Sequence, residues 1–131
     1  MRILITGSRD WASDAILSNA VAEAIPDNLT RVTLVHGACP TGADLFASQL
    51  ARRWRRFNEE AHPADWDTHG RAAGPIRNQA MVDLGADLCL AFIGPCTSPR
   101  CHKPGRHPSH GATHCADRAE KAGIPTRRYL A

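Results

Sequence analysis

Aromatic side chains are scarce in this chain. Phenylalanine, tryptophan and tyrosine together make up 5% of its 131 residues, so an aliphatic core is expected. The scarcity also counts against a surface that binds single-stranded nucleic acid, because such surfaces stack bases on exposed aromatic rings. Hydrophobic residues at 43% and charged residues at 22% are ordinary for a globular protein and argue against intrinsic disorder.

Long hydrophobic runs are also missing. A membrane-spanning helix needs about 18 or more consecutive apolar residues, and no run in the chain approaches that length. The apolar opening from Met1 to Gly7 is too short for a signal peptide. We therefore expect no membrane association and a cytoplasmic location. The five cysteines are an odd number, and a reducing compartment would keep them as thiols.

Acidic residues are absent from the segment between Cys96 and Cys115, which carries Arg100, Lys103 and Arg106. The net charge of the chain is +3, so the remaining residues sum to zero. This distribution argues against a chain-wide basic face for duplex DNA and leaves a small anionic ligand open. The length of 131 residues fits one domain spanning 1–131, with a Cys/His-rich loop at 94–115.

Short aliphatic runs alternate with amphipathic segments along the chain. Because parallel strands need a crossover, which a helix supplies, the alternation predicts the α/β class. We expect a Rossmann-like three-layer sandwich around a parallel sheet of about five strands, with ligands bound beyond the carboxyl ends of the strands. Strands are expected at 2–6, 32–36, 57–62, 87–93 and 124–129, helices at 12–25, 42–56, 75–84 and 112–122, and irregular loops at 63–74 and 96–110.

The first expected strand is followed by Gly7, Ser8, Arg9 and Asp10. Glycine permits a tight turn with exposed N–H groups, a helix begins close by, and arginine binds phosphate or carboxylate in a bidentate manner. These four residues are therefore predicted to bind an anionic ligand. The alternative is a plain turn in which Arg9 and Asp10 pair with each other.

The second expected strand is followed by a turn that contains Gly37, Ala38, Gly42 and Asp44. Its glycines have the spacing of a P-loop, but Ala43 and Asp44 stand where that motif needs Lys and Ser or Thr, so this is not a Walker A motif. The helix that begins at Gly42 can still offer backbone N–H groups to a phosphate. Asp44 is predicted either to bind a ribose hydroxyl or to cap its own helix.

A third group, Gly74, Arg77 and Asn78, lies at the start of the third expected helix. A guanidinium and an amide suit an anionic, hydrogen-bonding ligand such as a nucleotide. Arg77 is predicted to hold phosphate together with Arg9, and Asn78 to contact the sugar or the base. Trp66, in the preceding loop, either stacks on a base or serves as a packing anchor.

These motifs together resemble the YspA-like branch of the SLOG superfamily. The resemblance implies a Rossmann-like fold that binds a nucleotide or a nucleotide-derived molecule, as a sensor or processing module. The relatives it implies include the LOG phosphoribohydrolases and the Smf/DprA single-strand-binding proteins, and because SLOG proteins often multimerise, a homo-oligomer is left open. The matching motifs are Ile5-Thr6-Gly7-Ser8-Arg9-Asp10, His36-Gly37-Ala38, Gly42-Ala43-Asp44, Pro63-Ala64-Asp65-Trp66, Ala73-Gly74-Pro75-Ile76-Arg77-Asn78-Gln79-Ala80-Met81 and Ala122-Gly123-Ile124-Pro125.

The start of the last expected helix departs from the family. Where the family has a Gly-rich turn and Gly-Thr, this chain has Ser109-His110-Gly111-Ala112. The LOG hydrolases carry an acidic residue two places after that Thr, and the corresponding residue here is His114. Cleavage of an N-glycosidic bond needs a positioned acid or base, so a binding module is favoured over an enzyme. A nucleotide hydrolase of the LOG type is the alternative, and a single-strand nucleic-acid binder is less favoured.

Seven cysteine and histidine residues fall within the segment 96–115. Zinc is satisfied by four Cys or His ligands in a tetrahedron, and a Pro/Gly loop without an apolar core needs such a metal to become ordered. The alternative is a flexible basic loop with free thiols or one transient disulfide. The predicted ligands of a structural zinc are Cys96, Cys101, His107 and Cys115, with His110 as the first substitute.

Overall fold

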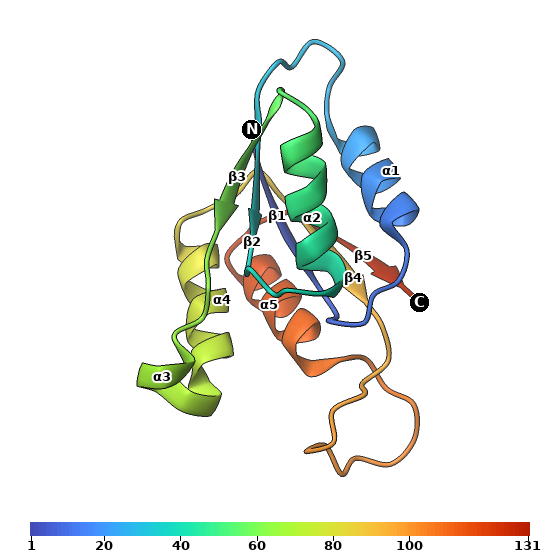
Figure 1. Cartoon of the computed structure of the whole chain (residues 1–131), viewed down its shortest axis with the longest axis vertical. Coiled ribbons are helices and arrows are strands. Elements are labelled where there is room, and N and C mark those ends of the chain that lie inside the picture. The colour runs from blue at the N-terminus through green and yellow to red at the C-terminus, as the bar shows by residue number, and fades with distance from the viewer.

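A parallel sheet of five strands forms the centre of the protein, in the order β3-β2-β1-β4-β5 (Figure 1). The computed structural model describes residues 1–131. Every pair of neighbouring strands is parallel, which confirms the predicted α/β, Rossmann-like class. The strands are β1 (Arg2–Gly7), β2 (Val32–His36), β3 (Phe57–Ala61), β4 (Leu88–Ile93) and β5 (Thr126–Leu130).

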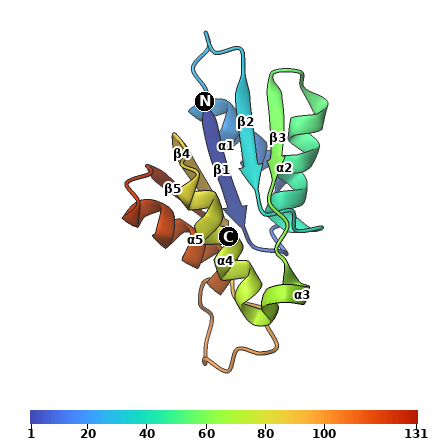
Figure 2. The same cartoon turned by 90° about the vertical axis from the view of Figure 1, so that its left-hand side faces the viewer.

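Helices cover both faces of the sheet, with α1 and α2 on one face and α4 and α5 on the other (Figures 1 and 2). Each long helix connects two consecutive strands, as a parallel sheet requires. The helices are α1 (Asp14–Ala24), α2 (Gly42–Arg53), α3 (Trp66–His69), α4 (Ala73–Asp83) and α5 (His110–Lys121), and a short 3-10 helix, η1 (Gly70–Ala72), joins α3 to α4.

The central strands are buried on both faces, which explains their nearly continuous apolar sequence. In β1, Ile3 and Ile5 pack on the α1/α2 side and Leu4 on the α4/α5 side. The core is largely aliphatic, as predicted; its buried aromatic residues are Trp11 and Phe92, and the ring of Phe92 stacks on Tyr129 with centroids 5.0 Å apart. Because successive side chains of a strand point to opposite faces of the sheet, each central strand contributes to two hydrophobic layers.

The strand order reverses between β1 and β4. The chain moves outward from β1 through β2 to β3 and then returns to place β4 on the other side of β1. The loops that leave the carboxyl ends of β1 and β4 therefore diverge, and this is where such sheets form a crevice. The segment between β4 and α5 extends beyond this edge (orange in Figure 1).

The expected loop at 63–74 contains more helix than predicted. Asp65 caps α3, because its Oδ1 accepts a hydrogen bond from the Thr68 N–H at 3.1 Å, and α4 already begins at Ala73. Pro75 is compatible with this start because the first turn of a helix leaves its N–H groups without helical partners. No helix of the protein combines the length and the apolar character needed to cross a bilayer.

Candidate ligand cavity and metal centre

A cavity of about 950 Å³ lies at the carboxyl ends of the strands. The segments after β1, β2, β3 and β4 and the first turns of α4 and α5 form its walls. Its volume is within the range of small-molecule and cofactor sites, about 300–1,000 Å³. Ten of the eleven residues predicted to bind a ligand line it: Gly7, Ser8, Arg9, Asp10, Gly37, Ala38, Asp44, Gly74, Arg77 and Asn78.

Gly42, the eleventh predicted residue, does not line the cavity. It stands at the start of α2 with a φ of +70°, and a Cβ there would lie 2.6 Å from the Arg9 carbonyl carbon. The loop after β1 therefore passes directly over a position that only glycine can occupy without displacement. Gly42 therefore lets the loop after β1 pack directly on the start of α2.

Ser8 connects the two loops that diverge at the strand reversal. Its hydroxyl oxygen accepts the Gly94 N–H at 2.8 Å and lies 2.6 Å from the Ser109 hydroxyl oxygen. Ser8 is buried and lines the cavity. Its hydroxyl is thus committed to the protein, and the backbone of its loop is what remains for a ligand.

The turn after β2 is shaped by His36, which is buried at the end of that strand. The His36 Nδ1 accepts the Ala38 N–H at 2.9 Å, and its Nε2 donates to the Glu59 carboxylate at 2.8 Å. An imidazole that accepts at Nδ1 carries its proton on Nε2. These bonds hold Ala38 in a left-handed conformation with a φ of +59°, at the wall of the cavity.

Asp44 is a buried carboxylate in the same wall. Its Oδ2 accepts the Cys39 N–H at 3.1 Å, so it ties the turn to the start of α2. Burial raises the pKa of Asp44, while the Cys39 amide and the positive charge of Arg77 oppose that shift. The cavity has only one other carboxylate, that of Asp10.

Arg77 makes three contacts within the protein. Its Nη1 donates to the carbonyl oxygens of Gly37 and His62, and its Nε donates to the Asn78 side-chain oxygen at 2.9 Å. A side chain on Gly37 would collide with this guanidinium. Arg77 therefore fastens the turn after β2 to α4, and its Nη2 is the nitrogen left to face the cavity.

Arg9 is placed differently. Its guanidinium lies over the Trp66 ring, 5.7 Å from the ring centroid, and both side chains line the cavity. The six ion pairs of the structure do not include one between Arg9 and Asp10, so the alternative of a self-paired turn is wrong. A guanidinium held only by an aromatic ring keeps its N–H donors for an anion.

Two helix N-termini contribute to the cavity. Gly74 and Pro75 of α4 and His110 and Gly111 of α5 lie in its wall. In α4 the Ala73 N–H donates to the Gly70 carbonyl oxygen and Pro75 has no N–H, whereas the first N–H groups of α5 have no side-chain cap, since the Ser109 hydroxyl is bonded to Ser8 instead. Uncapped N–H groups at the positive end of a helix dipole favour an anion.

The position at which the resemblance expects an acidic residue holds His114, which also lines the cavity. Burial and the charge of Arg118 lower the pKa of His114, so the neutral imidazole is favoured. The Asn78 amide nitrogen lies 3.4 Å from both the His114 Nδ1 and the Gly111 carbonyl oxygen. Asn78 therefore joins α4 to α5 across the cavity floor.

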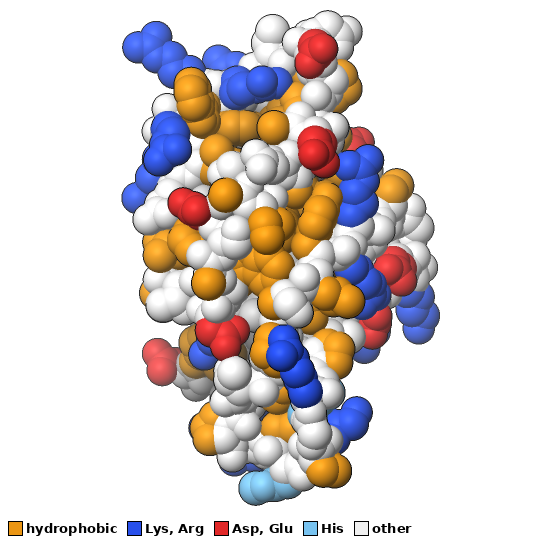
Figure 3. Space-filling model, turned by 90° about the vertical axis from the view of Figure 1, so that its right-hand side faces the viewer, with side chains coloured by type: hydrophobic (Ala, Val, Ile, Leu, Met, Phe, Trp, Pro, Cys, Tyr) orange, Lys and Arg blue, Asp and Glu red, His pale blue; other side chains and the backbone are white.

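On one face of the molecule the basic residues do not form a continuous positive patch. On the face shown in Figure 3, Lys and Arg side chains (blue) are interspersed with Asp and Glu (red). The cavity differs, because Arg9, Arg71 and Arg77 line it against the two carboxylates named above. The cavity therefore carries a local excess of positive charge.

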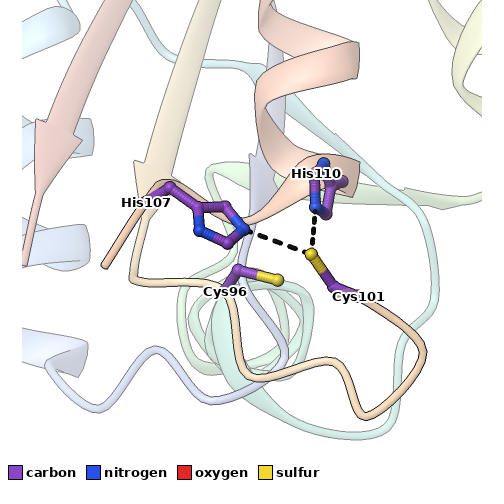
Figure 4. A group of neighbouring side chains, drawn as sticks. All are labelled: Cys96, Cys101, His107 and His110. Carbon is purple, nitrogen blue, oxygen red and sulfur yellow. Dashed lines mark hydrogen bonds between the residues drawn. The ribbon is translucent and has the colours of Figure 1, made fainter. Parts of the chain in front are cut away.

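Beside the cavity, Cys96, Cys101, His107 and His110 converge so that one donor atom of each lies within 4.8 Å of the others (Figure 4). The Cys101 Sγ is 3.3 Å from the Nε2 atoms of both histidines. Tetrahedral zinc, with bonds of about 2.0–2.3 Å, separates neighbouring ligand atoms by about 3.3–3.8 Å. This group of side chains, called the Cys/His cluster below, could hold a metal ion.

The contacts around His107 favour the same interpretation. Its Nδ1 lies 2.9 Å from the Gly105 carbonyl oxygen, and a carbonyl can only accept, so Nδ1 carries the proton. The lone pair of Nε2 then points to Cys101 and the rest of the cluster (Figure 4). A histidine that donates its other nitrogen to a carbonyl is the usual arrangement of a metal ligand.

The structure corrects one predicted metal ligand. Cys115 is not in the Cys/His cluster but is fully buried against Leu4 and Val35, and His110 completes the group in its place. Burial raises the pKa of Cys115 to about 11, which keeps the thiol protonated. The reason is helical: Cys115 shares the buried face of α5 with Ala112 and Ala119, whereas His110 is exposed at the helix start.

Some residues of the cavity wall were not predicted from the sequence to bind a ligand. The sequence predicts ligand residues after the first two strands and at the start of the third helix, and it predicts that the segment after β4 forms part of the pocket wall as a zinc-ordered loop, without assigning ligand-binding residues to it. Arg71 stands in the Gly-rich loop of the third group, between Gly70 and Gly74, but the sequence assigns it no role. Wall residues to which no ligand-binding role was assigned include Arg71, Cys96, Thr97, Ser98, Pro99, Ser109, His110 and His114.

A doubly wound parallel sheet whose strand order reverses beside a cavity defines the Rossmann-like class of proteins. Within this class, the chain belongs to the YspA, cpYpsA-related SLOG family, whose model matches residues 1–69. The chain is also 41% identical over 132 residues to the gene 61 protein of Mycobacterium phage D29, covering 98% of this chain and 95% of that protein. The Cys/His cluster lies outside the residues that the family model matches.

Proposed function

We propose that the protein binds a phosphate-bearing nucleotide or nucleotide derivative in the cavity, as a sensor or processing module. One observation carries this proposal: three arginines and the uncapped N-terminus of α5 converge on a single cavity of about 950 Å³. Arginine forks and helix N-termini are two independent ways of binding phosphate. Membership of a SLOG family supports a nucleotide-related ligand.

The role proposed for each side chain follows from the groups that its contacts within the protein leave available. Arg9 supplies phosphate donors, because its guanidinium is held only by the ring of Trp66. Trp66 is half exposed and offers an aromatic face to a base. Asp44 uses Oδ2 for the Cys39 amide and keeps Oδ1 for a ribose hydroxyl. Arg77 adds one nitrogen to the phosphate site while it holds the turn after β2.

The binding proposal is tested by isothermal titration of the protein with AMP and ADP-ribose, with adenosine as the ligand that lacks phosphate. We expect both phosphate-bearing ligands to bind and adenosine to bind much more weakly. Arg9→Gln should lower the affinity about tenfold, since one charge-assisted contact is lost. Arg31→Gln is the matched control, because Arg31 is exposed just before β2, at the opposite edge of the sheet.

Several outcomes would count against this assignment. If none of the three ligands binds, or if Arg9→Gln and Arg31→Gln behave alike, the cavity is not a phosphate-binding site. If an oligothymidylate binds more tightly than ADP-ribose, the single-strand binder is the better interpretation. Arg77→Ala is a poor test because its contacts hold Gly37 and His62, so the variant would also disturb the fold.

Hydrolysis of the bound nucleotide is a second candidate function, favoured by one observation. Asp44 is a buried carboxylate in the cavity wall with a raised pKa, as a general acid requires. Chromatography of AMP incubated with the protein would show adenine or adenosine if it is cleaved. Cleavage that Asp44→Asn abolishes would establish an enzyme, and unchanged AMP would leave a binding module.

We further propose that the Cys/His cluster binds zinc in a structural role. Two thiolates and two imidazoles are a donor set that zinc accepts, and four protein ligands leave no open position for catalysis. Two thiolates also neutralise the dication, so the metal adds order to the loop without adding charge. Native mass spectrometry should show one zinc per chain after purification without chelator. A bare polypeptide mass after growth in zinc-supplemented medium would remove this proposal.

A further inference from the structure

The Cys/His cluster and the cavity share a wall. Cys96 and His110 belong to the cluster and also line the cavity, and Thr97, Ser98 and Pro99 continue the same wall. His110 is in addition the first residue of α5, whose uncapped N-terminus faces the cavity. The metal centre therefore adjoins the groups to which the proposed function assigns phosphate binding.

Backbone contacts close the base of this loop but not its tip. The Cys96 N–H donates to the His107 carbonyl oxygen at 2.7 Å, and the Ser109 N–H donates to the Gly94 carbonyl oxygen at 2.9 Å. An isolated antiparallel bridge joins Pro95 to Pro108 at the same place. These contacts define the base of the loop and hold its two ends together.

Beyond this base, burial does not order the chain. None of the residues from 95 to 109 is buried. Within 97–106 the only partly shielded side chain is that of Cys101, which points at the cluster (Figure 4). A segment that buries no apolar surface cannot offset its conformational entropy by packing. The donors of the cluster are thus the groups that connect the tip to the wall and to α5.

We propose that a metal ion in the Cys/His cluster positions the wall of the nucleotide cavity, so that the affinity for the nucleotide depends on the metal. Cys101 and His107 are then positioning residues, since neither lines the cavity, and they act on the ligand only through the metal. This inference rests on the proposed nucleotide-binding function. Without metal, the wall samples many conformations, and the apparent affinity falls with the fraction of molecules that have the wall in place.

Cys101→Ser is the variant that tests this proposal, with His102→Ala as the matched control. His102 is the exposed neighbour of Cys101 and stands outside the cluster. Zinc content and ADP-ribose affinity are measured on the same samples. We expect Cys101→Ser to lose zinc and to bind ADP-ribose at least about tenfold more weakly, as when the competent fraction falls to one tenth. His102→Ala should keep both, and Cys101→His, which restores a ligand, should recover both.

Each alternative outcome has a distinct meaning. A zinc-loaded wild-type protein that does not bind ADP-ribose contradicts the proposed function itself. A Cys101→Ser protein that lacks zinc but binds ADP-ribose as tightly as the wild type overturns the present inference and leaves the proposed function standing. Far-UV circular dichroism of the variant checks that the sheet and helices are intact, because the hydrophobic core lies outside the loop.

A second measurement separates positioning from a general loss of stability. By linkage, if zinc raises the affinity for ADP-ribose by some factor, ADP-ribose must raise the affinity for zinc by the same factor. Titration of the wild-type protein with zinc against a competing chelator, with and without ADP-ribose, should show this increase. In the cobalt-substituted protein, ADP-ribose should also shift the d–d absorption bands, since His110 belongs to both sites. Equal zinc affinities in the two titrations would refute the coupling.

Discussion

The hydroxyl groups of Ser8 and Ser109 lie 2.6 Å apart, although 101 residues separate them in the chain. Ser8 follows β1 and Ser109 precedes α5, so this contact spans the point at which the strand order reverses. The Ser8 oxygen also accepts the Gly94 N–H at 2.8 Å. One buried side chain thus holds together the loops between which the cavity opens.

Replacing Ser8 with alanine should therefore destabilise the fold. The Gly94 N–H would lose its acceptor in a buried site, which costs about 1–3 kcal/mol. Urea denaturation followed by circular dichroism measures the loss in the free energy of unfolding. Ser18→Ala, on α1, is the control and should change that free energy by less than about 0.5 kcal/mol. Equal effects of the two substitutions would show that the Ser8 contacts contribute little.

Gly42 and Gly111 form a matched pair of glycines at the starts of α2 and α5. Gly42→Ala should lower the free energy of unfolding by about 2 kcal/mol or more, because φ is +70° and the new Cβ would collide with the Arg9 backbone. Nothing lies within 4 Å of a Cβ on Gly111, so Gly111→Ala should be neutral or stabilising by up to about 1 kcal/mol. Thermal unfolding of both variants checks the contrast, which a stable Gly42→Ala protein would contradict.

Glu60 on β3 makes the stability depend on pH. Arg2 donates to both of its carboxylate oxygens, at 2.9 and 2.8 Å, and His62 bonds the second one. These contacts lower the pKa of Glu60 from 4.5 to about 2. A carboxyl whose pKa is depressed by folding stabilises the protein above its unfolded pKa, and that contribution is lost as the pH falls from 4.5 toward 2.

Comparison of the wild type with Glu60→Gln measures this contribution. At pH 7 the variant should be less stable by up to about 1 kcal/mol, and the difference should shrink as the pH falls below 4.5. Urea titrations at several pH values give the difference in the free energy of unfolding. Glu23→Gln, on the exposed side of α1, should show a difference near zero throughout. A Glu60→Gln difference that does not change with pH would refute the assignment.

Cys115 and Cys96 should respond differently to substitution. Cys115→Ala removes a buried thiol from the α5 face and should cost about 1 kcal/mol of stability while leaving the zinc content at one per chain. Cys96→Ser removes a member of the Cys/His cluster and should abolish zinc binding. Elemental analysis of the two purified proteins distinguishes these cases. Loss of zinc from Cys115→Ala would restore the ligand set first predicted from the sequence.

The order of strands and helices was predictable because its signals are local. A strand buried on both faces is apolar along its whole length, as in Leu88–Ile93, and an amphipathic helix repeats its apolar residues on one face. The α/β class and the parallel sheet follow from this alternation. The turns after the strands were predictable for the same reason, since glycine and arginine next to a strand end are visible in the sequence.

Contacts between distant segments could not be predicted. Arg77 was assigned to phosphate, but it donates to the carbonyl oxygens of Gly37 and His62, which the chain brings to it only when β2, β3 and α4 assemble. The expected loop at 63–74 contains α3 because Asp65 caps it, a feature of only a few residues that carries little periodicity. Propensity over so short a segment is weak, and its surroundings decide the conformation.

The choice between Cys115 and His110 as a metal ligand shows what the sequence alone does not decide. By itself the sequence determined that a segment rich in Cys and His would follow the fourth strand, and that three strand ends would carry polar and glycine residues. Only the tertiary structure decided which donors meet, because the way α5 packs on the sheet buries Cys115 against Leu4 and leaves His110 at the helix start. Periodicity assigns residues to faces of a helix, but the direction in which each face points is set by packing against the rest of the chain.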